Sequence, residues 1–260
     1  MTINYLDSKR LQGLSADTKP TNVQTNSIFI ETDTAKRYWY NGTLWKLNLD
    51  SDFNFSSATG WVNGTNGGVR YNVANGVLNL DAMSEGVTDN RIYYDLGGSV
   101  SDTAWVMRFK LVINNYVQGT QPQHLSYSMN LCKLAVAGNV TNSFIGFHHA
   151  SNYSVSYNTS QDALDGSQQG SGTGTNFSAT PSAGTFYIQI RRMSATQIKV
   201  AIFSNSDYTT LTQELTETCD AGIVDLRYIQ MCSHTSQIAG NARWSGTIDD
   251  LVFRDGVTSI

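Results

Sequence analysis

The sequence has few charged residues and no long apolar run. Lys, Arg, Asp and Glu make up 15% of the 260 residues, against about a quarter in an ordinary globular chain. The net charge is −4 and the basic residues form no block, so we expect no nucleic-acid partner. No stretch approaches the ~20 apolar residues of a membrane span. The N-terminus has no apolar segment either, so we expect neither membrane insertion nor a signal peptide.

Cysteine is also scarce, and glutamate is scarcer than the length suggests. The three cysteines form no CxxC pair and have no zinc-like spacing to histidine, so we expect free, buried thiols. Only four glutamates occur, and Glu214 and Glu217, three residues apart, would lie on opposite faces of a strand. Glycoside cleavage requires two carboxyl groups that flank one bond. We therefore predict a protein that is not an enzyme.

What residues 50–260 do contain is alternation of polar and apolar residues over short segments. Phe186, Ile188 and Ile190, for example, alternate with polar or less apolar residues. A period of two indicates one buried and one exposed strand face, and many such segments predict antiparallel sheets packed as a sandwich. Residues 159–184, which are rich in Gly, Ser, Thr and Gln, are predicted to form a mobile loop inside this domain.

A smaller β pattern precedes this domain. Residues 1–26 are predicted to be a mostly irregular arm, with one or two helical turns between Asn4 and Gly13. Residues 27–48 predict a three-stranded β-meander in which Asn41-Gly42 forms the second turn. So small a sheet is not stable alone. We therefore expect this module to pack on the main body or on another chain, either a sister chain or another protein.

Four segments of residues 50–260 resemble concanavalin A-like and laminin-G-like jelly rolls, including carbohydrate-binding modules. They are the opening Asp52–Asn54 with Trp61, the strand Trp105–Leu111, the strand pair Phe186–Phe203, and the closing WSGTIDDLVFRDG at Trp244–Gly256. The resemblance implies an all-β fold, a two-sheet antiparallel jelly-roll sandwich with the small N-terminal three-stranded β-meander before it.

The meander resembles a short hairpin found in tail-fibre, tail-tip and other virion proteins. The residues concerned are the TDT turn at Thr32–Thr34, the aromatic strand Arg37–Tyr40, the NG turn and Trp45, which occur in register. The resemblance implies a virion-associated or surface structural protein that self-associates or binds other virion proteins through this module. The expected location is a virion or an extracellular surface.

The jelly-roll resemblance also implies a structural Ca²⁺. In carbohydrate-binding jelly rolls, an Asp of the closing strand and an oxygen ligand of the first strand often share this ion. The matching positions are Asp249 and Asp52. Carboxylate oxygens suit calcium, but an exposed Asp249 without any metal is the alternative.

A ligand site is predicted beside the long loop. Phe147, His149, Asn152, Tyr153 and Tyr157 combine aromatic rings with amide and imidazole groups on neighbouring strands. Such groups suit a host glycan or receptor, and loops on a rigid sandwich commonly carry function. The alternative is that these aromatic residues belong to the core.

Two other functions stay open on the sequence. One is a carbohydrate-binding module of a polysaccharide-degrading system, which the opening and closing motifs favour. The other is a divergent polysaccharide lyase or hydrolase, which the missing carboxylate pair disfavours.

Overall fold

The structure is a computed structural model that divides into two compact units, Met1–Asp50 and Ser51–Ile260. It describes residues 4–7, 9–34, 36–40, 42–47, 51–53, 55–64, 71–83, 91–117, 125–134, 144–151, 155–161, 183–235 and 243–260. At some strand ends only the backbone is described. Within these ranges no helix is long and apolar enough to cross a membrane.

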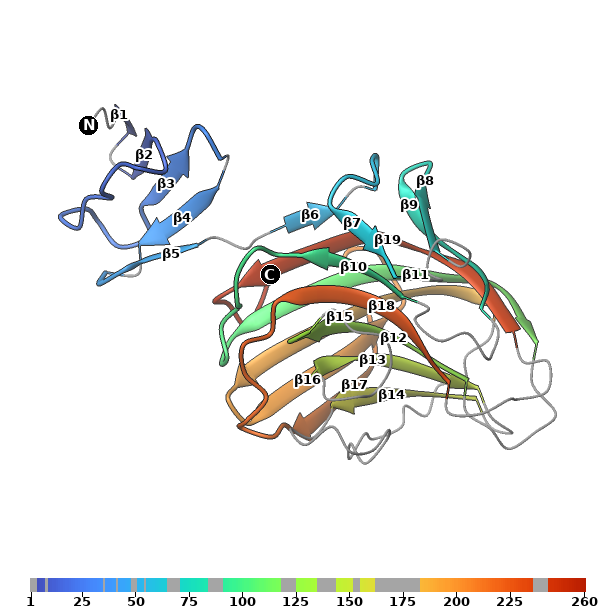
Figure 1. Cartoon of the computed structure of the whole chain (residues 1–260). Helices are drawn as coiled ribbons and strands as arrows, with labels where there is room; N and C mark the ends of the chain where they lie inside the picture. The colour runs from blue at the N-terminus through green and yellow to red at the C-terminus, as the bar shows by residue number, and fades with distance from the viewer. Residues whose placement is uncertain are drawn as a thin grey trace. The chain divides into compact units, whose positions relative to one another are not determined.

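The N-terminal unit is one five-stranded sheet (Figure 1). Its strands, in spatial as well as chain order, are β1 (Asn4–Asp7), β2 (Arg10–Gly13), β3 (Ile28–Glu31), β4 (Arg37–Tyr40) and β5 (Trp45–Leu47). The last three form the predicted meander. β2 pairs with β3 in parallel, and the other neighbours are antiparallel.

The predicted irregular or helical arm is therefore wrong for Asn4–Asp7 and Arg10–Gly13, which form β1 and β2. Leu11 explains the difference, because it pairs with Phe29 of β3 and both side chains are buried, at 1% and 0% exposure. Burial on a neighbouring strand outweighs the weak helical propensity of so short a segment. The meander is thus part of a larger sheet.

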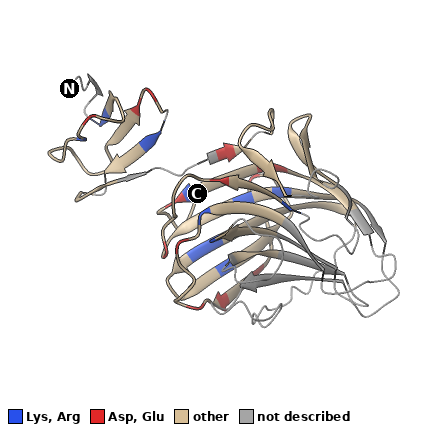
Figure 2. Ribbon diagram, viewed as in Figure 1, with Lys and Arg blue, Asp and Glu red and all other residues tan. Residues whose placement is uncertain are grey.

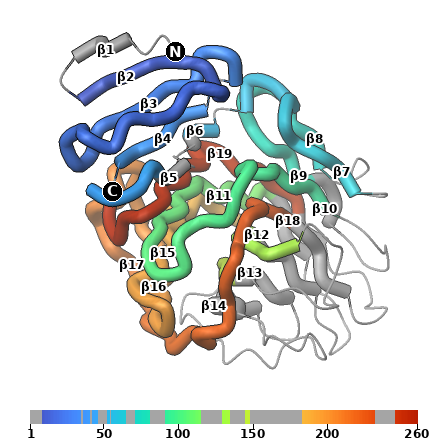
Figure 3. The backbone as a smooth tube through the Cα atoms, turned by 60° about the vertical axis from the view of Figure 1, so that its left-hand side comes forward, coloured from blue at the N-terminus to red at the C-terminus, as the bar shows by residue number. Residues whose placement is uncertain are grey.

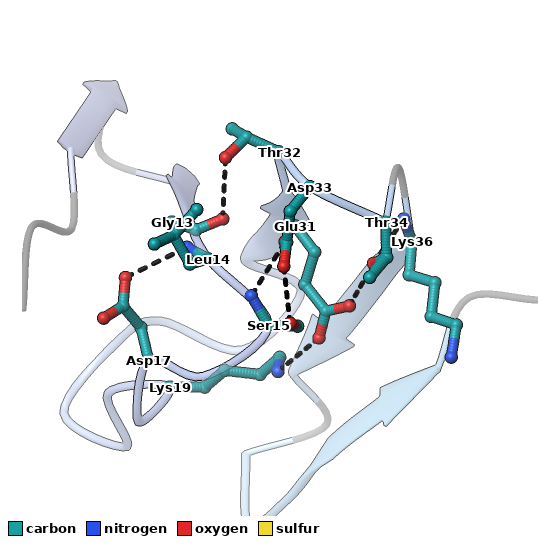
Figure 4. Close-up of polar contacts among 10 residues, drawn as sticks. All are labelled: Gly13, Leu14, Ser15, Asp17, Lys19, Glu31, Thr32, Asp33, Thr34 and Lys36. Atoms are coloured by element: carbon teal, nitrogen blue, oxygen red, sulfur yellow. Dashed lines mark hydrogen bonds and ion pairs between the residues drawn. The ribbon is translucent and has the colours of Figure 1, made fainter.

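A polar cluster fixes the connection between β2 and β3 onto one face of this sheet (Figure 4). Glu31, only 3% exposed, forms an ion pair with Lys19 at 2.8 Å and accepts a hydrogen bond from Thr34. The Lys19 ammonium lies 4.1 Å from the centre of the Tyr38 ring. Asp33 accepts hydrogen bonds from the backbone and hydroxyl of Ser15.

The second unit contains two antiparallel sheets (Figure 1). The six-stranded sheet has the order β14-β13-β12-β18-β10-β7. Its strands are β7 (Trp61–Asn63), β10 (Arg91–Asp95), β12 (Leu125–Cys132), β13 (Phe144–Ser151), β14 (Val155–Gln161) and β18 (Tyr228–Thr235).

The eight-stranded sheet has the order β17-β16-β15-β11-β19-β9-β8, with β6 also pairing with β19. Its strands are β6 (Ser51–Phe53), β8 (Tyr71–Ala74), β9 (Val77–Met83), β11 (Trp105–Val117), β15 (Gly184–Ser194), β16 (Gln197–Phe203), β17 (Leu211–Thr218) and β19 (Arg243–Asp255). β11 and β19 are distant in the chain but run side by side (Figure 3).

The core lies between these two sheets. Phe109 of β11 and Phe147 of β13 meet there, with ring centres 6.3 Å apart. Trp105, fully buried, packs against Phe253 of the closing strand. The prediction of an all-β, two-sheet antiparallel jelly-roll sandwich is confirmed. The predicted loop 159–184 is shorter, because β14 extends to Gln161, and residues 162–182 lie outside the described residues.

Candidate ligand-binding face

Phe147 is the only predicted ligand residue whose side chain the structure describes. It is 2% exposed and packs against Phe109, so it belongs to the core and has no ring face open to a ligand. The backbone of His149 pairs with that of Tyr157. Asn152 and Tyr153, with the side chains of His149 and Tyr157, lie outside the described residues.

The candidate site lies instead on the outer face of the six-stranded sheet. Its inner face carries the buried residues Ile92, Met129, Leu131, Ile229 and Met231, which line the sandwich core. Successive side chains of a strand point to opposite faces. Tyr93, Asn130 and Gln230, each next to an inner residue, therefore lie on the outer face.

Strand register aligns these residues into one row across the sheet. Asn130 of β12 lies opposite Gly146 of β13 and opposite Gln230 of β18. Gln230 in turn lies opposite Tyr93 of β10. Directly opposed residues bring their Cβ atoms to about 5 Å. Two amides and a phenol from three strands are thereby neighbours, and Gly146 adds a position without a side chain.

Both amides of this row are buried although they lie on the outer face. Asn130 is 1% exposed and Gln230 is 2% exposed. A Cβ added at Gly146 would lie 2.0 Å from Asn130 Oδ1 and 2.6 Å from the carbonyl oxygen of Met129. The absence of a side chain at Gly146 thus leaves the space that the Asn130 amide fills. Packing against Gly146 positions the Asn130 amide, and neither amide is open to solvent.

Two tyrosines flank the amides. The rings of Tyr93 and Tyr228 meet edge to face, with centres 5.8 Å apart and planes at 89°. The Arg91 guanidinium lies 5.7 Å from the Tyr93 ring, and that of Arg227 lies 5.3 Å from the Tyr228 ring. These contacts place both rings at defined angles on the face.

Arg227 is itself fixed by Asp95 at the end of β10. Its Nε and Nη2 donate to the two carboxylate oxygens of Asp95, each at 2.7 Å. The hydrogen bonds from Arg227 hold the pKa of Asp95 below its ordinary value, and the pKa of Arg227 is raised. The bidentate geometry fixes the guanidinium plane beside Tyr228.

We call Tyr93, Asn130, Gly146, Tyr228 and Gln230 the tyrosine–amide row. The rings of Tyr93 and Tyr228 are half-buried and offer a flat apolar surface, which suits the face of a polyhydroxylated ring. The amides of Asn130 and Gln230 lie buried beside them. The sequence signal was weak, because a single polar residue between apolar neighbours, as in Met129-Asn130-Leu131, also describes an ordinary solvent-facing strand position.

The two predicted calcium ligands lie on the other sheet with separate partners. Asp52 forms an ion pair with Arg254 at 2.6 Å, and Asp249 forms one with Lys110 at 3.7 Å. Asp52 lies opposite Val252, three residues along β19 from Asp249. Calcium ligands lie within about 2.6 Å of the ion. Each carboxylate thus has a cationic partner with which a shared calcium ion would compete.

No larger acidic or metal-binding cluster replaces this pair in the part of the chain that the structure describes, where no three His, Cys, Asp or Glu residues gather. The calcium hypothesis stays a prediction.

The fold of the second unit is a concanavalin A-like jelly roll. Among solved structures, basic winged bean lectin with Tn-antigen is similar with a TM-score of 0.52 and 12% identity, over 79% of this chain and 97% of the lectin. Lotus tetragonolobus seed lectin gives 0.51 and 10%, over 81% and 100%. The CBM2 module of the evolved Dit of Lactobacillus casei BL23 phage J-1 gives 0.46 and 11%, over 82% and 97%.

These similarities concern the fold, because the identities are low. No protein family matches the sequence, and no curated protein is similar to it.

Proposed function

We propose that this protein is a non-enzymatic glycan-binding protein whose jelly roll binds sugar at the tyrosine–amide row. The observation that carries the proposal is the pair of half-buried rings of Tyr93 and Tyr228, which cross edge to face on the outer face of the sheet beside the buried amides of Asn130 and Gln230. Ligand sites combine apolar surface with a few fixed polar groups. Rings that are held at fixed angles by Arg91 and Arg227 lose little side-chain entropy when a ligand binds.

We further propose that the N-terminal unit attaches the jelly roll to a virion or a comparable surface assembly. Two observations support this role. The hairpin resembles those of virion proteins, and residues 1–50 form a compact unit of their own. Its sheet is small, with Leu11, Phe29 and Tyr40 as its described buried apolar residues, so association with further copies or proteins would add burial.

We also propose that the protein has no catalytic activity, and the placement of Glu214 and Glu217 supports this. Glu214 is paired with both Arg191 and Lys199, whereas Glu217 is buried. The two do not share an open face between which a glycosidic bond could lie. A panel of mixed polysaccharides should therefore yield no soluble products, and release of products would contradict this part.

Glycan binding is tested with the full chain on a glycan array. We expect the Tyr93→Ala and Tyr228→Ala variants to lose about tenfold in affinity for any neutral glycan that the wild type binds, because each removes an aromatic surface. Trp39→Ala, which removes an aromatic side chain from the N-terminal unit, is the control and should bind normally. An array without any bound glycan, or equal losses in all three variants, would overturn the proposal.

The attachment role is tested by light scattering of the full chain during size-exclusion chromatography. We expect oligomers, and we expect Leu11→Ser to shift them toward monomer by exposing the buried face of β2. A protein that stays monomeric at high concentration, and that does not bind a virion fraction, would contradict the role.

A further inference from the structure

The outer face of the eight-stranded sheet carries a group of cations on adjacent strands. Figure 2 shows Lys and Arg in blue on the strands of this sheet. The cations are Arg108 and Lys110 on β11, Arg191 on β15, Lys199 on β16 and Arg254 on β19. They alternate with buried residues such as Met107 and Ile190, so they face away from the core.

All of these cations except Arg108 pair with a described Asp or Glu side chain. Lys110 pairs with Asp249, Arg254 with Asp52, and both Arg191 and Lys199 with Glu214. None of the described Asp and Glu side chains is paired with Arg108. Its Nη2 donates instead to the main-chain oxygen of Ile260, the last residue of the sequence, at 2.5 Å.

Arg108 and Arg191 are also close enough to repel each other. Register places Arg191 opposite Val106 and Arg108 opposite Gln189, which makes the two arginines diagonal neighbours on one face. Burial lowers the pKa of Arg108; Tyr208 opposes this shift, and the charge of Arg191 adds to it. Two guanidinium groups in this arrangement favour a shared anion.

Tyr208 completes the cluster from the loop after β16. Its ring lies 4.6 Å from the Arg108 guanidinium and packs edge to face on Tyr187 and Phe203, at 5.9 and 5.5 Å. Its φ is 56°, an unfavourable value for a bulky residue. Asn205 enforces this turn, because its Oδ1 accepts from the backbone N–H groups of Thr209 and Thr210.

Three donors of this cluster have no acceptor among the described residues. They are Arg108 Nε, Arg191 Nε and the Tyr208 hydroxyl, and all three atoms are buried. Buried donors are nearly always hydrogen-bonded, so three together at one place need an explanation. An acceptor that carries negative charge would satisfy the donors and also relieve the repulsion between the two arginines.

We propose that Arg108, Arg191 and Tyr208 form a second binding site, which takes the carboxylate of an acidic sugar. The planar guanidinium matches a carboxylate in geometry. The main-chain oxygen of Ile260 marks where an acceptor meets Arg108. Ile260 is 42% exposed, so a ligand can displace it. The acidic sugar is chosen because the proposed function is glycan binding, and the inference rests on it in that respect.

The described carboxylates of this face favour a single carboxylate over a polyanion. Four of them, Asp52, Glu214, Asp249 and Asp250, lie among the cations. A polyanion such as nucleic acid would meet these four carboxylates and be repelled. A monosaccharide with one carboxylate can contact Arg108 and Arg191 without reaching all four.

The test measures glucuronate and glucose binding to the full chain by NMR titration. We expect the wild type to bind glucuronate at this site and not glucose, and Arg108→Gln to weaken glucuronate binding at least about tenfold. Lys110→Gln is the matched control, because it removes the same charge from the same strand face but from a paired cation. It should change the affinity less than about twofold. Tyr208→Phe, which removes only the hydroxyl, should weaken binding while the fold is retained.

The outcomes separate this inference from the proposed function. A wild type that does not bind glucuronate, or equal losses in Arg108→Gln and Lys110→Gln, overturns the acidic-sugar site. If Tyr93→Ala abolishes glucuronate binding and Arg108→Gln does not, the ligand binds at the tyrosine–amide row, and only the inference fails. Should Arg108→Gln unfold the protein, Tyr208→Phe decides alone, and unchanged affinity in that variant counts against the site.

Discussion

At the scale of single residues, several positions depend on what lies directly across from them. Gly146 is one, because a Cβ there would collide with the Asn130 amide. Arg192 is another, since it is fully buried and donates to the carbonyl oxygens of Ser194, Ala195 and Ile223. A sequence shows neither relation, because Asn130 lies on another strand from Gly146 and Ile223 is 31 residues from Arg192.

Gly60 allows a direct test of such a relation. Its φ is 85°, and a Cβ would lie 2.5 Å from the Tyr94 ring, which is itself packed between Phe53 and Trp61. We expect Gly60→Ala to lower the free energy of unfolding by about 1 kcal/mol for the backbone and by about 1–3 kcal/mol more for the clash. Urea denaturation measures the sum of the two losses.

Gly97 is the matched control for this prediction. Its φ is 84°, but a Cβ added there meets no atom within 4 Å. Gly97→Ala should therefore show the backbone cost alone, of about 1 kcal/mol. If the two variants lose equal stability, the contact with Tyr94 does not determine the effect.

At the scale of elements, the N-terminal sheet depends on the connection between β2 and β3 as much as on its strands. The Trp45 indole donates to the carbonyl oxygen of Pro20 at 2.7 Å, and the Tyr40 hydroxyl donates to that of Thr21 at 2.9 Å. Together with the pair of Lys19 and Glu31, these bonds attach the connection to the sheet face. The sequence predicted the meander but not this cover, because its residues are polar and unpatterned.

The Glu31 cluster makes this attachment dependent on pH. Burial raises the pKa of Glu31, but hydrogen bonds from Lys19, Thr34 and Tyr38 outweigh it, so the pKa lies below its ordinary value of 4.5. Burial and the bond to Glu31 likewise raise the pKa of Tyr38 to about 12. A lowered carboxyl pKa stabilises the fold above the ordinary value, and the stabilisation is lost as pH falls through the lowered value.

We therefore expect the connection to leave the sheet face as the pH falls through the lowered pKa of Glu31. The Trp45 indole N–H resonance reports this, because that group is bonded to Pro20 in the attached state. In Glu31→Gln the resonance should lose this pH dependence. A wild-type resonance that stays constant down to strongly acid pH would show that Glu31 does not control the attachment.

At the scale of the whole molecule, strands from distant parts of the chain make both candidate sites. The tyrosine–amide row uses β10, β12, β13 and β18, and the cation cluster uses β11, β15 and the loop after β16. The sandwich places the two sites on the outer faces of different sheets. Each site can therefore be altered without a change in the other. Tyr93→Ala alters only the tyrosine–amide row, and Arg108→Gln alters only the cation cluster.

A structural calcium ion would stabilise the whole jelly roll and not a single element. If Asp52 and Asp249 bind calcium, a chelator should lower the melting temperature, and Asp249→Asn should abolish the difference. The ion pairs with Arg254 and Lys110 compete with such a site. An unchanged melting temperature in chelator, with no calcium in the purified protein, would exclude the ion.

The sequence by itself determined that the chain is all-β, that its main body is a jelly roll, and that a small hairpin module precedes it. The β content and the hairpin follow from local properties, because alternation with a period of two and an Asn-Gly turn act over a few residues. The jelly roll was implied by the resemblance of motifs in residues 50–260, including those around Asp52 and Asp249, to a known family. The sequence did not determine that the first strands join the N-terminal sheet.

Only the tertiary structure decided which polar and aromatic residues meet. It placed Phe147 in the core, because β13 faces β11, and it brought Asn130 beside Gln230, because β12 pairs with β18. It likewise placed Arg108 next to Arg191, where none of the described Asp and Glu side chains pairs with it. The physical reason is the same in each case: burial and partners depend on strand pairing between distant segments, and no local pattern encodes that pairing.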